Sequence, residues 1–302
     1  MKKGVIGLWA VAVTMVLLLV AAAMGFAKPD AKGQAIASVE QLEGCVMAGI
    51  DAARLPEENA EVLFETILGT KLSGYHAVSD MDELLYELRS GRADVICCPD
   101  VTAEYLLRTE KGLSRVEVPA DTANGVEGGG RLSFAMAMRT GDEALCQELN
   151  AAVSELEADG TLTALQVAYV DADEPLDFYE EKKSSGKKTL YVGVTGTVPP
   201  LDRLDENGVP CGFSVAFLAE LEKRTGYRFE TVVIEPKDSF TLLNSGKIDL
   251  LFAYGTSRNT TPGEKDYLVT KGYYTMQEYA YLTLEKTSGV SEQERETEEE
   301  GA

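Results

Sequence analysis

The sequence predicts an α/β fold, and three observations lead to this prediction. Apolar runs of strand length alternate with segments whose apolar residues recur at helical spacing. A helix–turn–strand pattern occurs twice, at residues 90–100 and 245–255. Residues 171–188 are acidic and then rich in Lys, Ser and Gly, which is typical of a linker. The chain is therefore expected to form two related α/β regions on either side of a linker.

The repeated stretch places candidate ligand residues. In both copies Ser-Gly ends a helix, a basic residue and an Asp form the turn, and an apolar run begins a buried strand. Ligands of open α/β sheets bind beyond the carboxyl ends of the strands. That rule points to Asp100 and to residues 254–258, each just past its strand. Two ordinary turns with nothing bound remain the alternative.

The first half of the chain alternates strands and helices. Strands are expected where apolar runs are short or alternate, and helices where apolar residues share one face and Gly or Asp-Gly follows. In order, these elements are a strand at 44–49, a helix at 57–68, a strand at 75–78, a helix at 80–89 capped by Ser79, a strand at 95–98, a helix at 101–107, strands at 114–118 and 132–138, and helices at 142–156 and 161–168. Glycines at 125 and 128–130 predict a loop over 121–130.

The second half continues in the same way. In order, it is expected to form a strand at 190–194, a turn at 205–208, a helix from Ser214 to a stop at Gly226, a strand at 229–234, a helix at 238–244, the second copy of the repeated stretch, a polar loop at 255–266 and a strand at 279–284. The acidic segment at 286–302 is expected to be a disordered tail.

Composition excludes some classes of function. The chain has 302 residues and a net charge of −22, and phosphate binding needs clustered Lys and Arg, so nucleic acid is not an expected partner. The five cysteines match no zinc spacing, and four of them are expected to be small core residues. Cys97 and Cys98 are adjacent on one strand and should face opposite sides of the sheet.

Residues 1–27 have the pattern of a targeting segment. Lys2 and Lys3 precede an apolar, charge-free run from 4 to 26, and Gly25-Phe26-Ala27 fits a cleavage site. The run is also long enough to span a bilayer, so a cleaved signal peptide and a retained membrane anchor both stay open. In either case the remainder is expected to be exported, to the extracellular or periplasmic face.

Several motifs together resemble a known family. Residues 189–285 are similar to the first lobe of the type 2 periplasmic solute-binding proteins that serve amino-acid ABC transporters. The matching motifs are Leu190-Tyr191-Val192-Gly193-Val194, Pro199-Pro200-Leu201, Asp205-Glu206-Asn207-Gly208, Gly212-Phe213-Ser214-Val215, Leu243-Asn244-Ser245-Gly246-Lys247-Ile248-Asp249 and Gly272-Tyr273-Tyr274. The resemblance implies a two-lobed periplasmic-binding-protein-like clamshell that closes on a small solute.

The remaining motifs of the family are present in rotated order. Residues 38–130 resemble the second lobe, and 131–170 resemble the return strand and C-terminal helices of the first lobe. With 171–188 as linker, this order predicts a circular permutation, which surface termini tolerate. A truncated tandem of two such domains is the alternative.

The resemblance also implies a ligand site. Asp100 matches the family's ammonium-binding aspartate, although it could instead cap the helix that follows. Arg258, with Thr256 and Ser257 as hydroxyl donors, is the candidate grip for a carboxylate. Tyr254 or Phe213 is the candidate apolar wall, and either could instead be a core residue. Leu201 stands where the family has an aromatic residue.

The expected function is therefore solute binding and not catalysis. The chain is expected to capture a small polar solute, such as an amino acid, for an ABC permease, without a cofactor or metal. A membrane-anchored sensory ectodomain with a signalling partner, and a degenerate protein that no longer binds, are the alternatives. His76 is the only histidine, and its sequence neighbourhood suggests no catalytic partner. No Gly-rich phosphate loop occurs in a strand–helix context.

Overall fold

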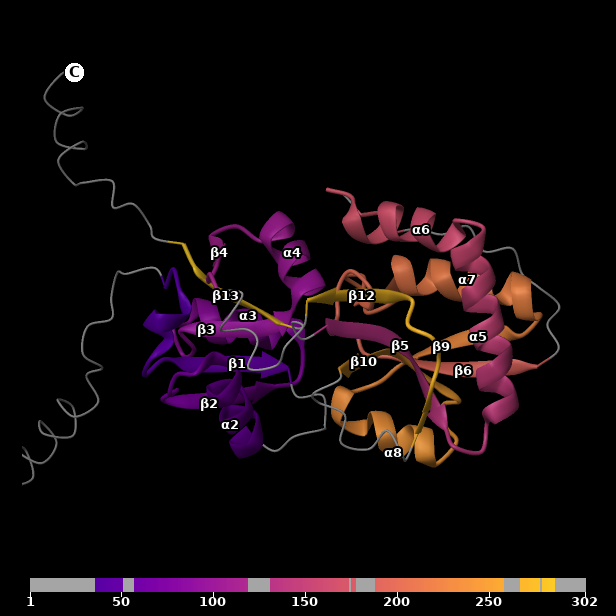
Figure 1. Ribbon diagram of the computed structural model, residues 1–302, viewed down its shortest axis with the longest axis horizontal. Coiled ribbons are helices and arrows are strands. Elements are labelled where there is room, and N and C mark those ends of the chain that lie inside the picture. The colour runs from indigo at the N-terminus through magenta and orange to yellow at the C-terminus, as the bar shows by residue number, and fades with distance from the viewer. Residues whose placement is uncertain are drawn as a thin grey trace, which may run out of the picture. The chain divides into compact units, whose positions relative to one another are not determined.

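Two mixed sheets, each covered by helices, make up the computed structural model of the chain (Figure 1). The structure describes residues 36–50, 57–118, 131–173, 175–177, 188–257, 267–277 and 279–285. The expected targeting segment, the Gly-rich loop, most of the linker, Arg258 and the acidic tail lie outside these residues. Residues 36–285 cluster as one unit by their contacts.

The first sheet has the order β2-β1-β3-β13-β4. Its strands are β1 (Val46–Ile50), β2 (Gly74–Val78), β3 (Val95–Pro99), β4 (Leu113–Arg115) and β13 (Tyr279–Leu284). The first three strands are parallel, and β13 runs antiparallel between β3 and β4. The accompanying helices are the 3-10 turn η1 (Val39–Leu42), α2 (Glu57–Leu68), α3 (Met81–Arg89) and α4 (Asp100–Thr109). We call residues 36–118 and 279–285 the N-terminal lobe.

The second sheet has the order β11-β5-β10-β6-β9, and β12 pairs with another part of β5. Its strands are β5 (Arg131–Arg139), β6 (Thr189–Val194), β9 (Arg228–Val233), β10 (Leu250–Ser257), β11 (Tyr267–Val269) and β12 (Tyr274–Gln277), and β7 (Arg203–Leu204) with β8 (Pro210–Cys211) forms a small ribbon. The helices are α5 (Glu143–Ala158), α6 (Thr161–Gln166), the π-helical turn η2 (Val167–Asp171), α7 (Phe213–Thr225), η3 (Pro236–Asp238) and α8 (Ser239–Asn244). We call residues 131–277 the central lobe.

Both sheets follow one plan. In each, the second, first and third strands of a parallel set lie side by side, followed by an antiparallel strand from a distant part of the chain. That strand is β13 in the N-terminal lobe and β5 in the central lobe, and Figure 1 shows the yellow β13 among the purple strands. Residues 279–284 were expected to belong to the lobe formed by residues 189–285. Their pairing with β3 and β4 corrects this, because the chain has already crossed to the other sheet.

Apolar side chains on both faces of each sheet explain why these runs form central strands. In the N-terminal lobe, Cys98 lies in one buried cluster and Cys97 in another, on the opposite face of β3. This confirms that the two neighbouring cysteines point in opposite directions. In the central lobe the largest cluster packs α5, α6 and α7 against β5, β6 and β10. Cys97, Cys98, Cys146 and Cys211 are buried, as expected for four of the five cysteines.

Several expected boundaries are wrong. Helix α3 is capped by Asp80 and not Ser79, because the Asp80 side chain accepts a hydrogen bond from the Glu83 backbone N–H, while Glu83 reaches back to Ser79. Strand β10 continues to Ser257, so residues 254–257 lie within the strand and not beyond it. It extends because it pairs with β5 as far as Leu132. The helix expected at 161–168 changes to a π-helical turn at Val167.

No helix in the described ranges is long and apolar enough to cross a membrane.

Candidate functional site

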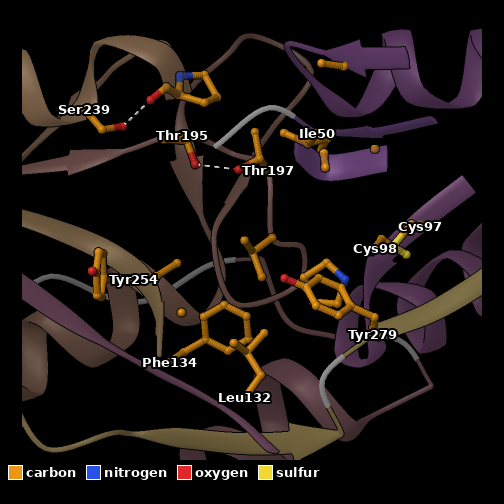
Figure 2. A pocket seen from close by; sticks show the side chains of 18 of the residues that line it. Ile50, Cys97, Cys98, Leu132, Phe134, Thr195, Thr197, Ser239, Tyr254 and Tyr279 are labelled. Carbon is orange, nitrogen blue, oxygen red and sulfur yellow. Dashed lines mark hydrogen bonds between the residues drawn. The ribbon is translucent and has the colours of Figure 1, made fainter. Parts of the chain in front are cut away.

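A pocket of about 230 Å³ is lined by residues of both lobes at the carboxyl ends of their parallel strands. The N-terminal lobe contributes Gly49 and Ile50 of β1 and Cys97, Cys98 and Pro99 of β3. The central lobe contributes Thr195, directly after β6, and residues 251–255 of β10. Figure 2 shows side chains from the purple early part and the brown later part of the chain around this space. The pocket therefore lies where the sequence rule for α/β sheets places a ligand.

Aromatic side chains form much of the pocket wall. On the N-terminal lobe, Phe64 of α2 stacks on Tyr75 of β2 with ring centroids 5.6 Å apart and meets Tyr279 of β13 edge-on at 5.5 Å. On the central lobe the wall includes Phe134, together with Phe240 and Tyr254 in an edge-on pair. Such pairs hold one another in place, so this wall is formed before any ligand arrives.

Gly49 makes room for Tyr75 in this wall. A Cβ at position 49 would lie 2.1 Å from the Tyr75 hydroxyl oxygen. Two non-bonded atoms cannot lie that close, so any other residue at position 49 would displace the Tyr75 ring from the end of β1. Gly49 thus shapes the pocket without a side chain of its own.

Strand β10 carries a bulge where it lines the pocket. Its register against β5 shifts between Leu251 and Tyr254, and Ala253 has a φ of 48°. A left-handed conformation costs a non-glycine residue about 1–2 kcal/mol. The Ala253 backbone N–H donates to the hydroxyl of the fully buried Tyr273 at 2.9 Å, which helps to hold the bulge. The bulge lies within the part of β10 that lines the pocket.

Two threonines connect the pocket to a buried carboxylate. Thr195 donates from its backbone N–H and from its hydroxyl to Asp202 Oδ2, both at 2.9 Å, and its hydroxyl lies 2.7 Å from that of Thr197. Both threonines line the pocket, and Figure 2 draws the bond between them. Asp202 is fully buried, and this burial raises the pKa of its carboxyl group.

The structure places Asp100 at the start of α4, directly after the pocket residue Pro99. The N-cap of α4 is Pro99, and Asp100 is the first residue of the helix itself. The alternative that Asp100 is the N-cap of this helix is therefore wrong. The Asp100 carboxylate instead accepts from Arg115 at 2.6 Å. Asp100 is not among the residues that line the pocket.

The other expected ligand residues separate into two groups. Tyr254 lines the pocket, while Phe213 is fully buried in the core of the central lobe, stacked on Phe217. Thr256 lies in β10 and its hydroxyl donates to the Ser133 backbone oxygen at 3.0 Å. Ser257 ends β10, and Arg258 lies outside the described residues.

Sequence reasoning missed several residues at the site. Thr195 and Thr197 follow the strong strand at 190–194, so the rule that selected Asp100 could have found them. The ring contacts of Phe64 with Tyr75 and Tyr279 depend on strand order and had no local signal in the sequence. His76 has a hydrogen-bond partner that its sequence neighbours do not reveal. Its Nδ1 lies 2.8 Å from Oε2 of Glu87, which belongs to helix α3.

The cysteine that lines the pocket is held in its protonated form. Burial raises the pKa of the Cys98 thiol to about 12, so this pocket cysteine stays protonated and is a poor nucleophile. Within the described residues, no cluster of His, Cys, Asp and Glu could hold a metal ion.

Comparison with known proteins finds a family that resembles part of the chain. Residues 190–295 match the family model of the bacterial extracellular solute-binding proteins, family 3. No curated protein matches the sequence.

Solved structures with similar coordinates share little sequence with this chain. A ligand-binding component of an ABC-type import system from Staphylococcus aureus, with zinc bound, is 11% identical, with a TM-score of 0.41 over 84% of this chain and 69% of that one. An amino acid ABC transporter substrate-binding protein from Streptococcus pneumoniae, bound to L-arginine, is 12% identical, with a TM-score of 0.38 over 87% and 91%. A putative methionine-binding lipoprotein from Bacillus subtilis is 11% identical, with a TM-score of 0.38 over 86% and 90%.

None of the three reaches a TM-score of 0.5, so the family match and the pocket carry the functional argument. The match begins with the strand and the Pro-Pro and Gly-Phe-Ser motifs on which the sequence resemblance depends. Residues 190–295, about a third of the chain, are therefore similar to the bacterial extracellular solute-binding proteins, family 3.

Proposed function

We propose that the chain is an extracytoplasmic solute-binding protein that captures a small solute between two lobes and presents it to an ABC permease. The observation that carries this proposal is the pocket, whose wall comes from the strand ends of both sheets. A ligand there touches both lobes at once, so its binding energy favours the arrangement in which the lobes meet. The family match over residues 190–295 supports the same function.

We also propose that the lobes are circularly permuted relative to that family. Support comes from the shared strand plan, in which β5 and β13 each complete the sheet of the other chain region. In a permuted clamshell the matched segment lies late in the chain, and residues 190–295 do. A chain rearranged to run from residue 188 to 285, through a flexible link, and on from residue 36 to 173 should then fold with unchanged ligand affinity. A rearranged chain that cannot fold or bind would contradict the permutation.

Ligand-dependent thermal unfolding of the full-length chain tests the binding function. A panel of amino acids, organic acids, amines and neutral small molecules is screened. A ligand that binds only the folded state stabilises it by about 2.7 kcal/mol at a hundredfold excess over its Kd. A panel without any stabilising member would contradict a binding function.

Matched variants locate any hit in the pocket. Tyr279→Ala removes part of the aromatic wall, and Tyr86→Ala removes a tyrosine that is 57% exposed on α3 and does not line the pocket. We expect the hit to weaken at least tenfold in the first variant and to persist in the second. Asp100→Ala tests the ammonium role from the sequence resemblance, since that role requires a loss for amines and amino acids alone.

A membrane-anchored sensory ectodomain is the second candidate. The apolar, charge-free run at residues 4–26 favours it, because its length suits a permanent bilayer span. The mass of the mature protein, measured in both the membrane fraction and the soluble extracytoplasmic fraction, distinguishes the two. Cleavage after Ala27 supports a released receptor, and an intact N-terminus supports the anchored form.

A further inference from the structure

The described lining of the pocket consists of uncharged side chains only. It combines aromatic rings such as Phe64, Tyr75 and Tyr279 with aliphatic side chains and the hydroxyl-bearing residues Thr195, Thr197 and Ser239, of which Ser239 donates its proton to the Pro236 backbone oxygen. A ligand that fills such a lining gains from apolar contact and from ring stacking. A charged ligand group would instead lose its hydration and require a charged partner.

The carboxylate next to the pocket, that of Asp100, already has a positively charged partner within its own lobe. Asp100 is ion-paired with Arg115, which also holds Glu104. An incoming ammonium group would have to compete with a guanidinium at 2.6 Å for the same oxygen. This pairing within the N-terminal lobe removes the reason for an amino-acid ligand at Asp100.

The two threonines give the pocket one directional polar contact. The Thr195 hydroxyl has a single proton, and it donates this proton to Asp202 Oδ2. Thr197 must therefore donate its own proton to Thr195 across 2.7 Å. The remaining lone pairs of Thr197 are hydrogen-bond acceptors, and they can receive a proton donor from the ligand.

The volume of the pocket limits the size of the ligand. At about 230 Å³ it lies below the roughly 300–1,000 Å³ of pockets that hold drug-sized molecules. It suits one ring, or a similarly compact apolar group, with a short polar extension.

We propose that this pocket selects a small uncharged solute with an aromatic or compact apolar body and one hydrogen-bond donor, which Thr197 accepts. The inference rests on the proposed binding function and names the class of its ligand. It departs from the polar solute that the sequence resemblance implies, because rings and neutral hydroxyls make up the part of the lining that the structure describes.

Probes that share one ring and differ in charge test the inference. Isothermal titration calorimetry on the full-length chain would compare 2-phenylethanol with 2-phenylethylammonium, phenylacetate and L-phenylalanine. The methyl ether of 2-phenylethanol keeps the ring and removes the donor. We expect the alcohol to bind at least tenfold more tightly than each charged probe and about tenfold more tightly than the ether.

Variants of Thr197 test the polar contact. Thr197→Val should reduce the affinity for 2-phenylethanol to that for the ether and leave the ether unchanged. Thr197→Ser keeps the hydroxyl and should restore the preference. Thr231→Val makes the same substitution at an exposed position of β9 and should change neither affinity. If the Thr197 variants fail to fold, the wild-type probe series decides alone.

Each outcome separates this inference from the binding function. A charged probe that binds as tightly as the alcohol, or any amino acid that binds while the neutral probes do not, overturns the inference and leaves the solute-binding function in place. No binding by any probe up to 10 mM overturns the inference, and together with an empty thermal panel it removes the binding function as well. An alcohol preference that survives Thr197→Val overturns the role of Thr197.

Discussion

Ala253 has a strained backbone conformation in the wall of the pocket. Its φ of 48° in the β10 bulge is a conformation that glycine adopts without penalty. We therefore expect Ala253→Gly to be neutral or to stabilise the fold by up to about 1 kcal/mol, since relief of about 1–2 kcal/mol is partly offset by chain entropy. Urea unfolding measures the change.

The partner strand supplies the control for this prediction. Ala135 of β5 pairs with Tyr254, is buried, and does not have the positive φ of Ala253. Ala135→Gly should destabilise the fold by about 0.5–1 kcal/mol, as glycine does in a strand interior. Equal destabilisation by the two substitutions would contradict a strained Ala253.

Gly49 and Tyr75 form a coupled pair. Gly49→Ala should destabilise the fold by about 1–3 kcal/mol, because the new methyl group overlaps the Tyr75 hydroxyl. Tyr75→Phe removes the overlapping oxygen and should recover part of this loss in the double variant. The measurement is a double-mutant cycle in urea. Additive effects would show that the two residues do not meet at this position.

Asp202 gives the fold a pH dependence of known sign. Burial raises the pKa of its carboxyl group above the unfolded value of about 3.9, so the folded state holds the proton more tightly than the unfolded state. The contribution of Asp202 to stability is therefore greatest below about pH 4 and declines as the pH rises through the folded-state pKa.

Asp202→Asn should remove this decline. Urea unfolding from pH 4 to pH 7 should show a flatter stability profile in the variant than in the wild type. Asp205→Asn is a control of opposite sign, because hydrogen bonds from the turn, the largest from the Val209 backbone, lower the pKa of Asp205. Stability from Asp205 is present above the unfolded pKa and lost as the pH falls. Parallel profiles for wild type and Asp202→Asn would contradict the buried carboxylate.

Residue-level features were the least predictable from sequence. Asp100 has the right place after its strand, yet only the structure shows that Arg115, from a different strand, occupies its carboxylate. Nothing local distinguishes Ala253 from an ordinary strand alanine, because the bulge arises from pairing with β5. Thr195 and Thr197 were detectable, since polar residues after a buried parallel strand are candidates by rule.

At the scale of elements, α3 is held to the first sheet by one buried carboxylate. Glu87 is 2% exposed and receives His76 of β2 at 2.8 Å and Arg92, beyond the helix, at 3.0 Å. Glu87→Ala should cost about 2 kcal/mol, because charged hydrogen bonds are lost and the space is left empty.

Two arginines test whether burial of the acid matters. Arg92→Ala leaves the buried Glu87 with fewer partners and should cost about 1–2 kcal/mol. Arg89→Ala breaks a pair with Glu110, whose side chain is 32% exposed, and should cost less than about 1 kcal/mol. Equal losses in the free energy of unfolding, measured by chemical denaturation, would mean that the ion pair with the buried Glu87 contributes no more than an exposed pair.

Elements with strong periodicity were predicted well. The helix at 57–68 coincides with α2, and the strand expected at 190–194 with β6 to within one residue. In both segments the spacing of the apolar residues is enough to predict the type of element, without information from distant parts of the chain. Strand β10 was cut short in the prediction because Gly255, Thr256 and Ser257 look like a loop. They remain in the strand because β5 supplies hydrogen-bond partners that are more than a hundred residues away in the chain.

For the whole molecule, the crossed strands predict cooperative unfolding. The N-terminal sheet needs β13 between β3 and β4, and Val101 of α4 is buried in the core of the central lobe, where its N–H meets the Met276 sulfur at 3.2 Å. Unfolding of one lobe would therefore leave β13 or its partner strands unpaired and would expose the buried Val101 to solvent. We expect a single transition with calorimetric and van't Hoff enthalpies that agree. Two separate transitions would instead favour the truncated tandem.

The place of β13 also makes the chain a natural candidate for division into complementing fragments. A break between β4 and β5 would leave one piece, ending near residue 118, with the edge strand β4 but without the strand that joins it to the sheet. The second piece would hold that strand as an exposed, unpaired apolar ribbon. Each piece supplies what the other lacks, so neither is expected to fold by itself and their mixture is expected to reassemble. Because of this topology, recovery of the folded protein would show that both fragments are present in the same solution.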